Sequence, residues 1–273
     1  MINPINIPVS YNYISAFLTF QCNLHCSYCI NKYNGLYKYT QMSVDDWVQG
    51  LNRIKARSDL PITLTGGEPT LHSGFYQIVS MVKKPMDLLS NGMFNIIEFV
   101  VNVPTKSFKR NTKYSSIRFS YHSKQSKLFE LFYKVVELQR FGYEVGVWAV
   151  GRTLKNYLLK IVAFFFDIDF RIKPLLEGKS KVYKYPEGLD GVAKKCLCKP
   201  SELLIAPDGR LFRCHHDLYH GVNSYGHILD KDIVLPNKFL PCDNFGKCNP
   251  CDLKLKYNRF QETGHCAMEI KVG

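Results

Sequence analysis

Residues 22–29 are Cys22-Asn23-Leu24-His25-Cys26-Ser27-Tyr28-Cys29, and this stretch decides the class of fold. Three thiolates at C-x3-C-x2-C spacing suit three irons of one cubane iron–sulfur cluster. The fourth iron then has no protein ligand and is open to a small molecule. A partial zinc site is the alternative, although zinc sites usually separate two pairs of ligands.

The cysteine triplet follows a β-rich run and begins a series of alternating strands and helices. Six strands are predicted, at 13–20, 61–65, 86–90, 117–121, 143–150 and 168–174. Ser43 as N-cap, with Asp46 at the third helical position, predicts a helix to about Arg57. Further helices are expected near 75–83 and at 128–140 and 156–166. Repeated strand–helix units predict a parallel sheet with right-handed crossovers, open or closed as a barrel.

Further motifs fall at the ends of the predicted strands. Gly66-Gly67-Glu68-Pro69 follows the second strand, Ser90-Asn91-Gly92 ends the third, and Ser120 lies in the fourth. With the triplet and Tyr28 at its aromatic position, this order resembles the radical S-adenosylmethionine (SAM) superfamily over about residues 13–175. The resemblance implies an α/β fold, a partial (β/α)6 TIM-like barrel.

The resemblance also implies the chemistry. Cys22, Cys26 and Cys29 would bind a [4Fe-4S] cluster whose open iron chelates SAM. Reductive cleavage of SAM would give a 5′-deoxyadenosyl radical that abstracts hydrogen from the substrate, with a low-potential flavodoxin or ferredoxin as electron donor. The implied cofactor contacts are Tyr28, Gly66, Gly67, Glu68, Pro69, Ser90, Asn91 and Ser120. The candidates for holding the SAM carboxylate are Arg118, Lys124 and Arg152.

The composition changes after Gly178, and we expect a radical SAM core at 1–185 and a small cysteine-rich α+β domain at 186–273. The run 203–212, with the turn Pro207-Asp208-Gly209, predicts a β-hairpin. Seven of the ten cysteines lie in this second part, a pattern similar to the SPASM or twitch extensions that carry auxiliary iron–sulfur clusters: Cys196, Cys198, Cys214, Cys242, Cys248, Cys251 and Cys266.

Several assignments of these cysteines stay open. The SPASM resemblance implies one cluster on Cys196, Cys198, Cys214 and Cys251 and a second on Cys242, Cys248 and Cys266. The twitch resemblance implies a single cluster on Cys198, Cys214, Cys248 and Cys251. Two fully ligated cubanes would need eight cysteines. A structural zinc ion at Cys248-x2-Cys251 is the non-iron alternative. The polar residues after Cys214, which include His215 and His216, line a substrate pocket, supply a histidine as the eighth cluster ligand, or form a polar loop near a cluster.

The composition favours some classes of binding partner and makes others unexpected. The chain has 273 residues and a net charge of +13, which favours anionic partners unless it reflects codon bias. No apolar run is long enough to span a membrane and no signal peptide is visible, so we expect a cytoplasmic protein with reduced cysteines and no membrane partner. Only about a dozen residues precede the first strand, so no fused leader-peptide-binding domain is expected.

The resemblance implies modification of a peptide or protein by crosslinking, oxidation or epimerisation. Oxidation or rearrangement of a small anionic sugar or nucleoside is the alternative. A zinc-binding, non-enzymatic nucleic-acid-binding protein is a remote third hypothesis. It leaves the Gly66–Pro69 and Ser90–Gly92 motifs unexplained, so nucleic acid is not an expected partner.

Overall fold

The computed structural model describes residues 3–27, 29, 31, 38–109, 114–173, 194–245, 255–258, 261–266 and 268–272. Tyr28, Cys248 and Cys251 lie outside the described residues. In the first part the elements are β1 (Ile5–Asn6), β2 (Tyr13–Thr19), α2 (Val44–Asn52), β3 (Ile54–Lys55), β4 (Ile62–Gly66), η1 (Pro69–Leu71), α3 (Phe75–Met81), β5 (Met86–Ser90), α4 (Ile96–Asn102), η2 (Thr105–Ser107), β6 (Ile117–Tyr121), α5 (Leu128–Arg140), β7 (Val145–Val150), α6 (Leu154–Phe165) and β8 (Asp169–Lys173). In the second part they are β9 (Lys194–Pro200), β10 (Glu202–Ile205), β11 (Leu211–Phe212), α7 (His215–His220), β12 (Leu240–Phe245), β13 (Leu255–Asn258), β14 (Gln261–Cys266) and β15 (Met268–Val272).

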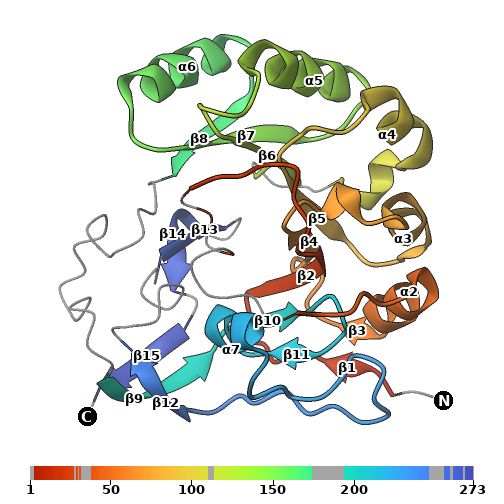
Figure 1. The fold of residues 1–273 in the computed structure, drawn as a ribbon, viewed down its shortest axis with the longest axis vertical. Helices are drawn as coiled ribbons and strands as arrows, with labels where there is room; N and C mark the ends of the chain where they lie inside the picture. Colours follow the sequence, from red (N-terminus) through yellow and green to blue (C-terminus); the bar gives the residue numbers. More distant parts are fainter. Residues whose placement is uncertain are drawn as a thin grey trace.

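An eight-stranded sheet, in the order β11-β10-β2-β4-β5-β6-β7-β8, forms the body of the molecule. The six strands from β2 to β8 pair in parallel, as the alternation of strands and helices predicts. Helices α2 to α6 follow the outside of this curved sheet (Figure 1). Within the described residues β11 and β8 are the edges of the sheet, so it forms no closed barrel.

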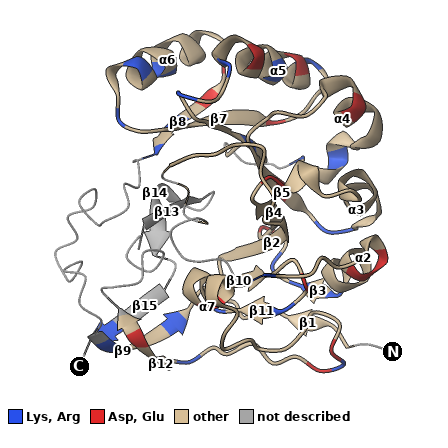
Figure 2. Cartoon of the chain, in the orientation of Figure 1, with Lys and Arg blue, Asp and Glu red and all other residues tan. Residues whose placement is uncertain are grey.

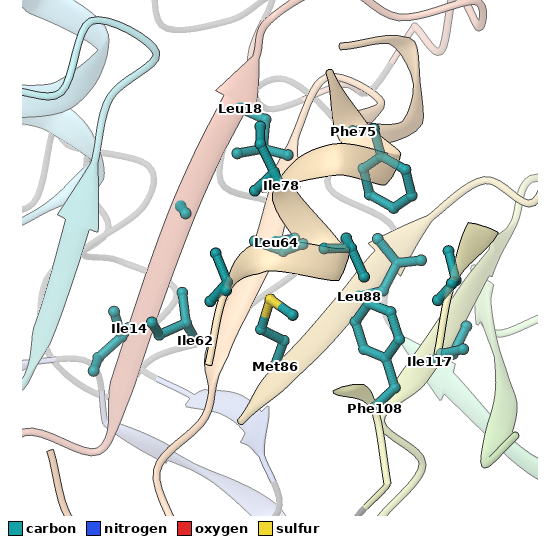
Figure 3. Packing of buried hydrophobic residues seen from close by; sticks show 14 of the residues in the cluster. Ile14, Leu18, Ile62, Leu64, Phe75, Ile78, Met86, Leu88, Phe108 and Ile117 are labelled. Carbon is teal, nitrogen blue, oxygen red and sulfur yellow. The ribbon is translucent and has the colours of Figure 1, made fainter. Parts of the chain in front are cut away.

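The parallel strands have two different faces because side chains alternate along a strand. Toward the helices they present apolar side chains such as Ile14, Leu64 and Leu88, which belong to one core cluster with Phe75 and Ile78 of α3 (Figure 3). The opposite face carries polar residues, among them Ser15, Thr65, Asp87, Arg118 and Ser120. The helix face therefore forms the core, and the inner face is available for a site.

Two predictions about helices need correction. The helix capped by Ser43 ends at Asn52, not near Arg57. The chain turns there because the Arg53 side chain donates to the backbone carbonyls of Asn3 and Ile228, and Ile54–Lys55 pairs with β1. The short helix α4, capped by the Asn95 side chain, was not predicted.

The predicted hairpin is confirmed, but its position is unexpected. β10 and β11 pair in antiparallel fashion, and β10 also pairs in parallel with β2, Leu203 lying beside Ile14. Residues late in the sequence thus extend the sheet of the first part. The expected boundary near residue 185 falls within 174–193, outside the described residues.

The remaining described strands form two small sheets. β9 is the middle strand of an antiparallel sheet between β12 and β15, and β13 pairs with β14. No helix in the described part of the chain is long and apolar enough to cross a membrane.

Candidate functional site

A cavity of about 380 Å³ opens at the carboxyl ends of the parallel strands. Ligands of parallel α/β sheets bind at this edge. Nine of the residues singled out from the sequence line it, namely Cys22, Cys26, Cys29, Gly66, Gly67, Glu68, Ser90, Asn91 and Ser120. Pro69 is buried at the first position of η1 and is not among the lining residues, and Tyr28 lies outside the described residues.

Hydrogen bonds from three strand ends hold the triplet loop at the cavity. The Glu68 backbone N–H donates to the Gln21 carbonyl (2.7 Å), just before Cys22. The Asn91 amide donates to the Asn23 side chain (2.6 Å). After β6, the Gln125 side chain accepts from the His25 backbone N–H (2.7 Å). The triplet loop therefore connects motifs that lie far apart in the sequence.

The two adjacent glycines allow this close approach. Gly66 has φ of +140°, and a Cβ there would lie 2.1 Å from the Thr19 carbonyl oxygen. A Cβ on Gly67 would lie 2.2 Å from the Gln21 carbonyl oxygen. Any side chain at either position would push the end of β4 away from the segment that leads into the triplet.

Glu68 links the second motif to the third. One carboxylate oxygen accepts from the Ser90 hydroxyl (2.8 Å) and from the Thr70 hydroxyl (2.7 Å), and the other accepts from the Asn91 backbone N–H (2.7 Å). Burial raises the pKa of Glu68, and these bonds favour its charged form. The carboxylate thus fixes the relative positions of two strand ends while it lines the cavity.

The three thiols of the triplet suit an iron–sulfur cluster in their chemistry. None is in a disulfide, and all three line one cavity. Burial raises the pKa of Cys22, as do the nearby charges of Glu68 and Cys29. Among the described residues no three His, Cys, Asp or Glu side chains are grouped closely enough to hold a metal ion. In a cubane cluster each thiolate binds a different iron, so the three ligands do not have to be close enough to share one ion.

The cavity also contains residues that the motifs did not predict. His122 follows β6, and burial lowers its pKa to about 4. Lys173 lies at the end of β8 and is the only Lys or Arg among the described lining residues. Position at the carboxyl end of a predicted strand was the signal that would have identified both residues.

The cations named from the sequence lie elsewhere. Arg118 is buried and pairs with Asp87 at 3.0 Å, on the inner face but not among the lining residues. Lys124 and Arg152 are exposed and do not line the cavity.

The late hairpin contributes to the same cavity. His215 and Tyr219 of α7 line it, because the pairing of β10 with β2 brings α7 to that end of the sheet. His215 Nδ1 lies 3.2 Å from the carboxylate of Glu202, which is buried. Of the three interpretations of the polar run after Cys214, the position of His215 in the cavity wall favours the pocket.

A second group of cysteines gathers around β9. Cys196 and Cys198 point to the same face of that strand, and Cys242 of β12 lies opposite Cys196. Hydrogen bonding to Cys198 contributes most to lowering the pKa of Cys242, to about 6. Burial lowers the pKa of Arg213, but the charge of Asp217 and those of Cys198 and Cys214 raise it overall. Both thiols therefore lie near this guanidinium. This grouping puts Cys242 beside Cys196 and Cys198, whereas the SPASM-based assignment separates them.

Comparisons with known proteins point to one superfamily. Residues 17–106 match the sequence profile of the Radical SAM superfamily. The sporulation killing factor maturation protein SkfB of Bacillus subtilis is 34% identical over 79 residues, which are 28% of this chain and 19% of that protein. The 7-carboxy-7-deazaguanine synthase of Clostridium acetobutylicum is 30% identical over 107 residues, 37% of this chain and 47% of that enzyme. The matches thus span less than half of these relatives.

Solved structures share the fold. Streptococcus suis SuiB bound to S-adenosylmethionine superposes with a TM-score of 0.53 at 16% identity, covering 81% of this chain and 64% of SuiB. The anSMEcpe protein with bound AdoMet and Kp18Cys peptide gives a TM-score of 0.54 at 15% identity, covering 80% of this chain and 77% of that one. These structures show that the chain shares the fold of SuiB and anSMEcpe, and its residues 17–106 are similar to the Radical SAM superfamily.

Proposed function

We propose that the chain is a radical SAM enzyme that binds a [4Fe-4S] cluster through Cys22, Cys26 and Cys29 and cleaves SAM in the adjoining cavity. One observation carries the proposal: a single cavity collects the triplet, the Gly66–Glu68 segment and the Ser90–Asn91 turn. When bound, the cluster and SAM supply a 5′-deoxyadenosyl radical that removes a hydrogen atom from the substrate. Hydrogen abstraction at an unactivated carbon is therefore the expected reaction.

The residues of the cavity have distinct roles in this proposal. Glu68 places a buried negative charge where an ammonium group of SAM would bind. Ser120 offers a hydroxyl to the sugar of SAM. Lys173, from the end of β8, supplies the positive charge for a carboxylate of SAM or of the substrate. The buried strand ends limit water at the reacting atoms.

We further propose a peptide or protein as the substrate. SuiB has been solved bound to the precursor peptide SuiA, with a TM-score of 0.52 to this chain, and anSMEcpe with the Kp18Cys peptide. A small anionic substrate is the second candidate. It is favoured by Lys173 in the cavity and by the GTP 3′,8-cyclase of Lactiplantibacillus plantarum, which is 30% identical over 91 residues, 31% of this chain and 27% of that enzyme.

An auxiliary cluster is proposed at the second cysteine group. Cys196, Cys198 and Cys242 lie beside one another on β9 and β12, and Cys214, like Cys198, lies near Arg213. α7 begins directly after Cys214, and its first residue, His215, lines the cavity. A cluster held by this group would accept the electron that a substrate radical must lose when it is oxidised. Cys248, Cys251 and Cys266 are candidates for the remaining ligands. A low-potential flavodoxin or ferredoxin is the proposed source of the electron for SAM cleavage.

The first experiment measures iron and acid-labile sulfide per chain after anaerobic reconstitution. The comparison is between the parent protein and a variant with Cys22, Cys26 and Cys29 all replaced by Ala. A fall from about eight irons to about four indicates one auxiliary cluster, and a fall from about twelve to about eight indicates two. Zinc in place of iron in the parent protein would contradict the proposal.

A second experiment separates the substrate candidates. Formation of 5′-deoxyadenosine from SAM is followed with dithionite as reductant, first alone and then with a peptide library or with a panel of nucleotides and sugar phosphates. Deuterium transfer from a labelled substrate into 5′-deoxyadenosine identifies the class that is attacked. Transfer from nucleotides alone would exclude the peptide.

A further inference from the structure

Helix α6 presents an apolar surface to the outside of the molecule. Leu154, Phe164 and Phe165 are 77%, 79% and 78% exposed, and five further apolar or aromatic side chains of this region are also exposed: Tyr157, Leu158, Ile161, Val162 and Phe166. A surface helix usually carries charged and polar residues on the face turned away from the core. On α6 both faces are apolar, and the outer one is uncovered in the described structure.

The arrangement around the helix axis is regular. At about 100° per residue, six of these side chains fill an arc of about 140° around the helix axis: Leu154, Tyr157, Leu158, Ile161, Val162 and Phe165. Lys155 and Lys160 lie at the two borders of that arc, and the buried Asn156 and Ala163 face the sheet. The exposed face is therefore an apolar strip with a lysine along each side.

The charges around the strip are mainly positive. Between Gly151 and Phe166 there are three cations, Arg152, Lys155 and Lys160, and the first acidic residue is the exposed Asp167 that follows. Figure 2 shows only blue on α6, whereas the neighbouring α5 carries both blue and red. In a symmetric contact with a second copy, the same lysines would meet each other, and the net charge of +13 would add to the repulsion. The partner that fits this strip therefore combines an apolar interior with negatively charged groups at its surface.

We propose that α6 docks the enzyme on an anionic lipid bilayer, lying in the interface with its apolar strip among the acyl chains. Aromatic and aliphatic residues on one face with flanking lysines are the pattern of helices that lie in membrane interfaces. Lys160 can reach the headgroups while its stem remains beside the strip. Lys155 Nζ lies 5.9 Å from the ring centroid of Tyr121 and would have to leave that ring to do the same. The proposal departs from the expectation of no membrane partner, but α6 does not cross the membrane, so it agrees with the lack of a spanning helix in the described chain.

The helix is already formed and anchored for this role. Thr153 caps its first turn, and the Asn156 amide donates to the carbonyls of Val150 (3.2 Å) and Gly151 (2.7 Å). Val150 also lines the cavity. Docking therefore requires no refolding, and it fixes the orientation of the enzyme relative to the bilayer. This inference is independent of the reaction proposed above.

The test is co-sedimentation of the full chain with phosphatidylcholine vesicles that contain or lack about one third phosphatidylglycerol. We expect binding to the anionic vesicles and weakening by salt. Replacing Ile161 and Phe165 together by Ser should lower the partition coefficient by about tenfold or more. Lys160→Gln should lower it by about fivefold. Phe129→Ser is the matched control, because Phe129 is 89% exposed on α5 but lies outside the strip.

Three results would overturn the proposal. The first is equal sedimentation with and without anionic vesicles. The second is equal loss of binding in the Ser double variant and in Phe129→Ser, which would mean that the strip has no special role. The third is a dimer, detected by light scattering of the parent protein, that disappears in the double variant, because a second copy would then cover the strip. Circular dichroism of each variant confirms that these exposed changes leave the fold intact.

Discussion

The two groups of cysteines are built in different ways. The triplet lies on a loop whose shape is set by the ends of neighbouring parallel strands, through the backbone of Gln21, the amide of Asn91 and the side chain of Gln125. In the second group, two thiols come from one antiparallel strand and one from its partner, with Cys242 opposite Cys196. The first group is thus positioned by the main sheet, and the second by strand register.

This difference determines how far the thiols of each group can change position. Thiols on a loop can adjust their positions to a bound group, and this loop faces a cavity. Thiols on paired strands are held by the ladder of backbone hydrogen bonds, which suits a site that transfers electrons without changing shape. His215 follows Cys214 directly, so the second group reaches the cavity of the first through α7.

The largest expected effect comes from breaking the triplet. Cys26→Ala should reduce SAM cleavage to background, because the cluster loses one of three thiolates, while most of the iron at the second group remains. The measurements are 5′-deoxyadenosine by chromatography and iron per chain. Persistent SAM cleavage would show that the triplet does not bind the cluster.

Breaking the second group should separate two activities. Cys214→Ala is expected to stop turnover of the substrate but to spare uncoupled SAM cleavage, because the Cys214 thiol lies with the second group. Product formation and 5′-deoxyadenosine are measured in the same reaction. Full turnover in this variant would remove the auxiliary role from the second group.

A pH titration tests how strongly the cavity wall excludes water. Burial lowers the pKa of His122 to about 4, whereas a histidine in the unfolded chain has a pKa of about 6.5. Between these values the unfolded state binds a proton that the folded state does not. The free energy of unfolding should therefore fall as the pH drops from about 6.5 to about 4, by about 3 kcal/mol in total.

Urea unfolding at a series of pH values measures this change. In His122→Gln the decline over the same pH range should be smaller than in the parent protein. An identical decline in both proteins would mean that His122 is not protected from water.

The smallest effect concerns the link between two strand ends. Each carboxylate oxygen of Glu68 accepts from a backbone N–H, one from Thr70 and the other from Asn91. Glu68→Gln turns one of these oxygens into an NH2 group that faces a donor, so it should lower the free energy of unfolding by about 1–3 kcal/mol. Glu130→Gln, at an exposed ion pair with Lys127, is the matched control and should change it much less. Equal values for the two variants would contradict the role of Glu68.

Much of the fold was predictable because the strands of the parallel sheet alternate regularly with helices and are bounded by residues typical of caps and turns. The six strands, the cap at Ser43 and the hairpin at 203–212 all follow local rules. The triplet and the glycine motif predicted the cavity for the same reason. They place polar and flexible residues directly after strands whose ends must meet at one edge.

The features of the fold and the site that could not be predicted depend on contacts between distant parts of the chain. Nothing local to Glu202–Ile205 indicates that β10 pairs in parallel with β2, so the approach of α7 to the cavity was not predictable. The early end of α2 depends on Arg53 donating to the carbonyls of Asn3 and Ile228, which lie far apart in the sequence. The grouping of Cys242 with Cys196 depends on the register between β9 and β12, and spacing along the sequence does not report register.

The pairing of β10 with β2 also has a consequence for biosynthesis. β2 leaves the ribosome well before its partner β10, which lies far behind it in the sequence. Until that partner emerges, β2 has one row of unpaired backbone groups, which is the type of edge that recruits other chains. Such a high contact order slows the closing step of folding. A nascent or truncated chain that ends after β8 is therefore expected to depend on chaperones, whereas the full chain finishes its sheet with the two-residue strand β11, too short to recruit a neighbour.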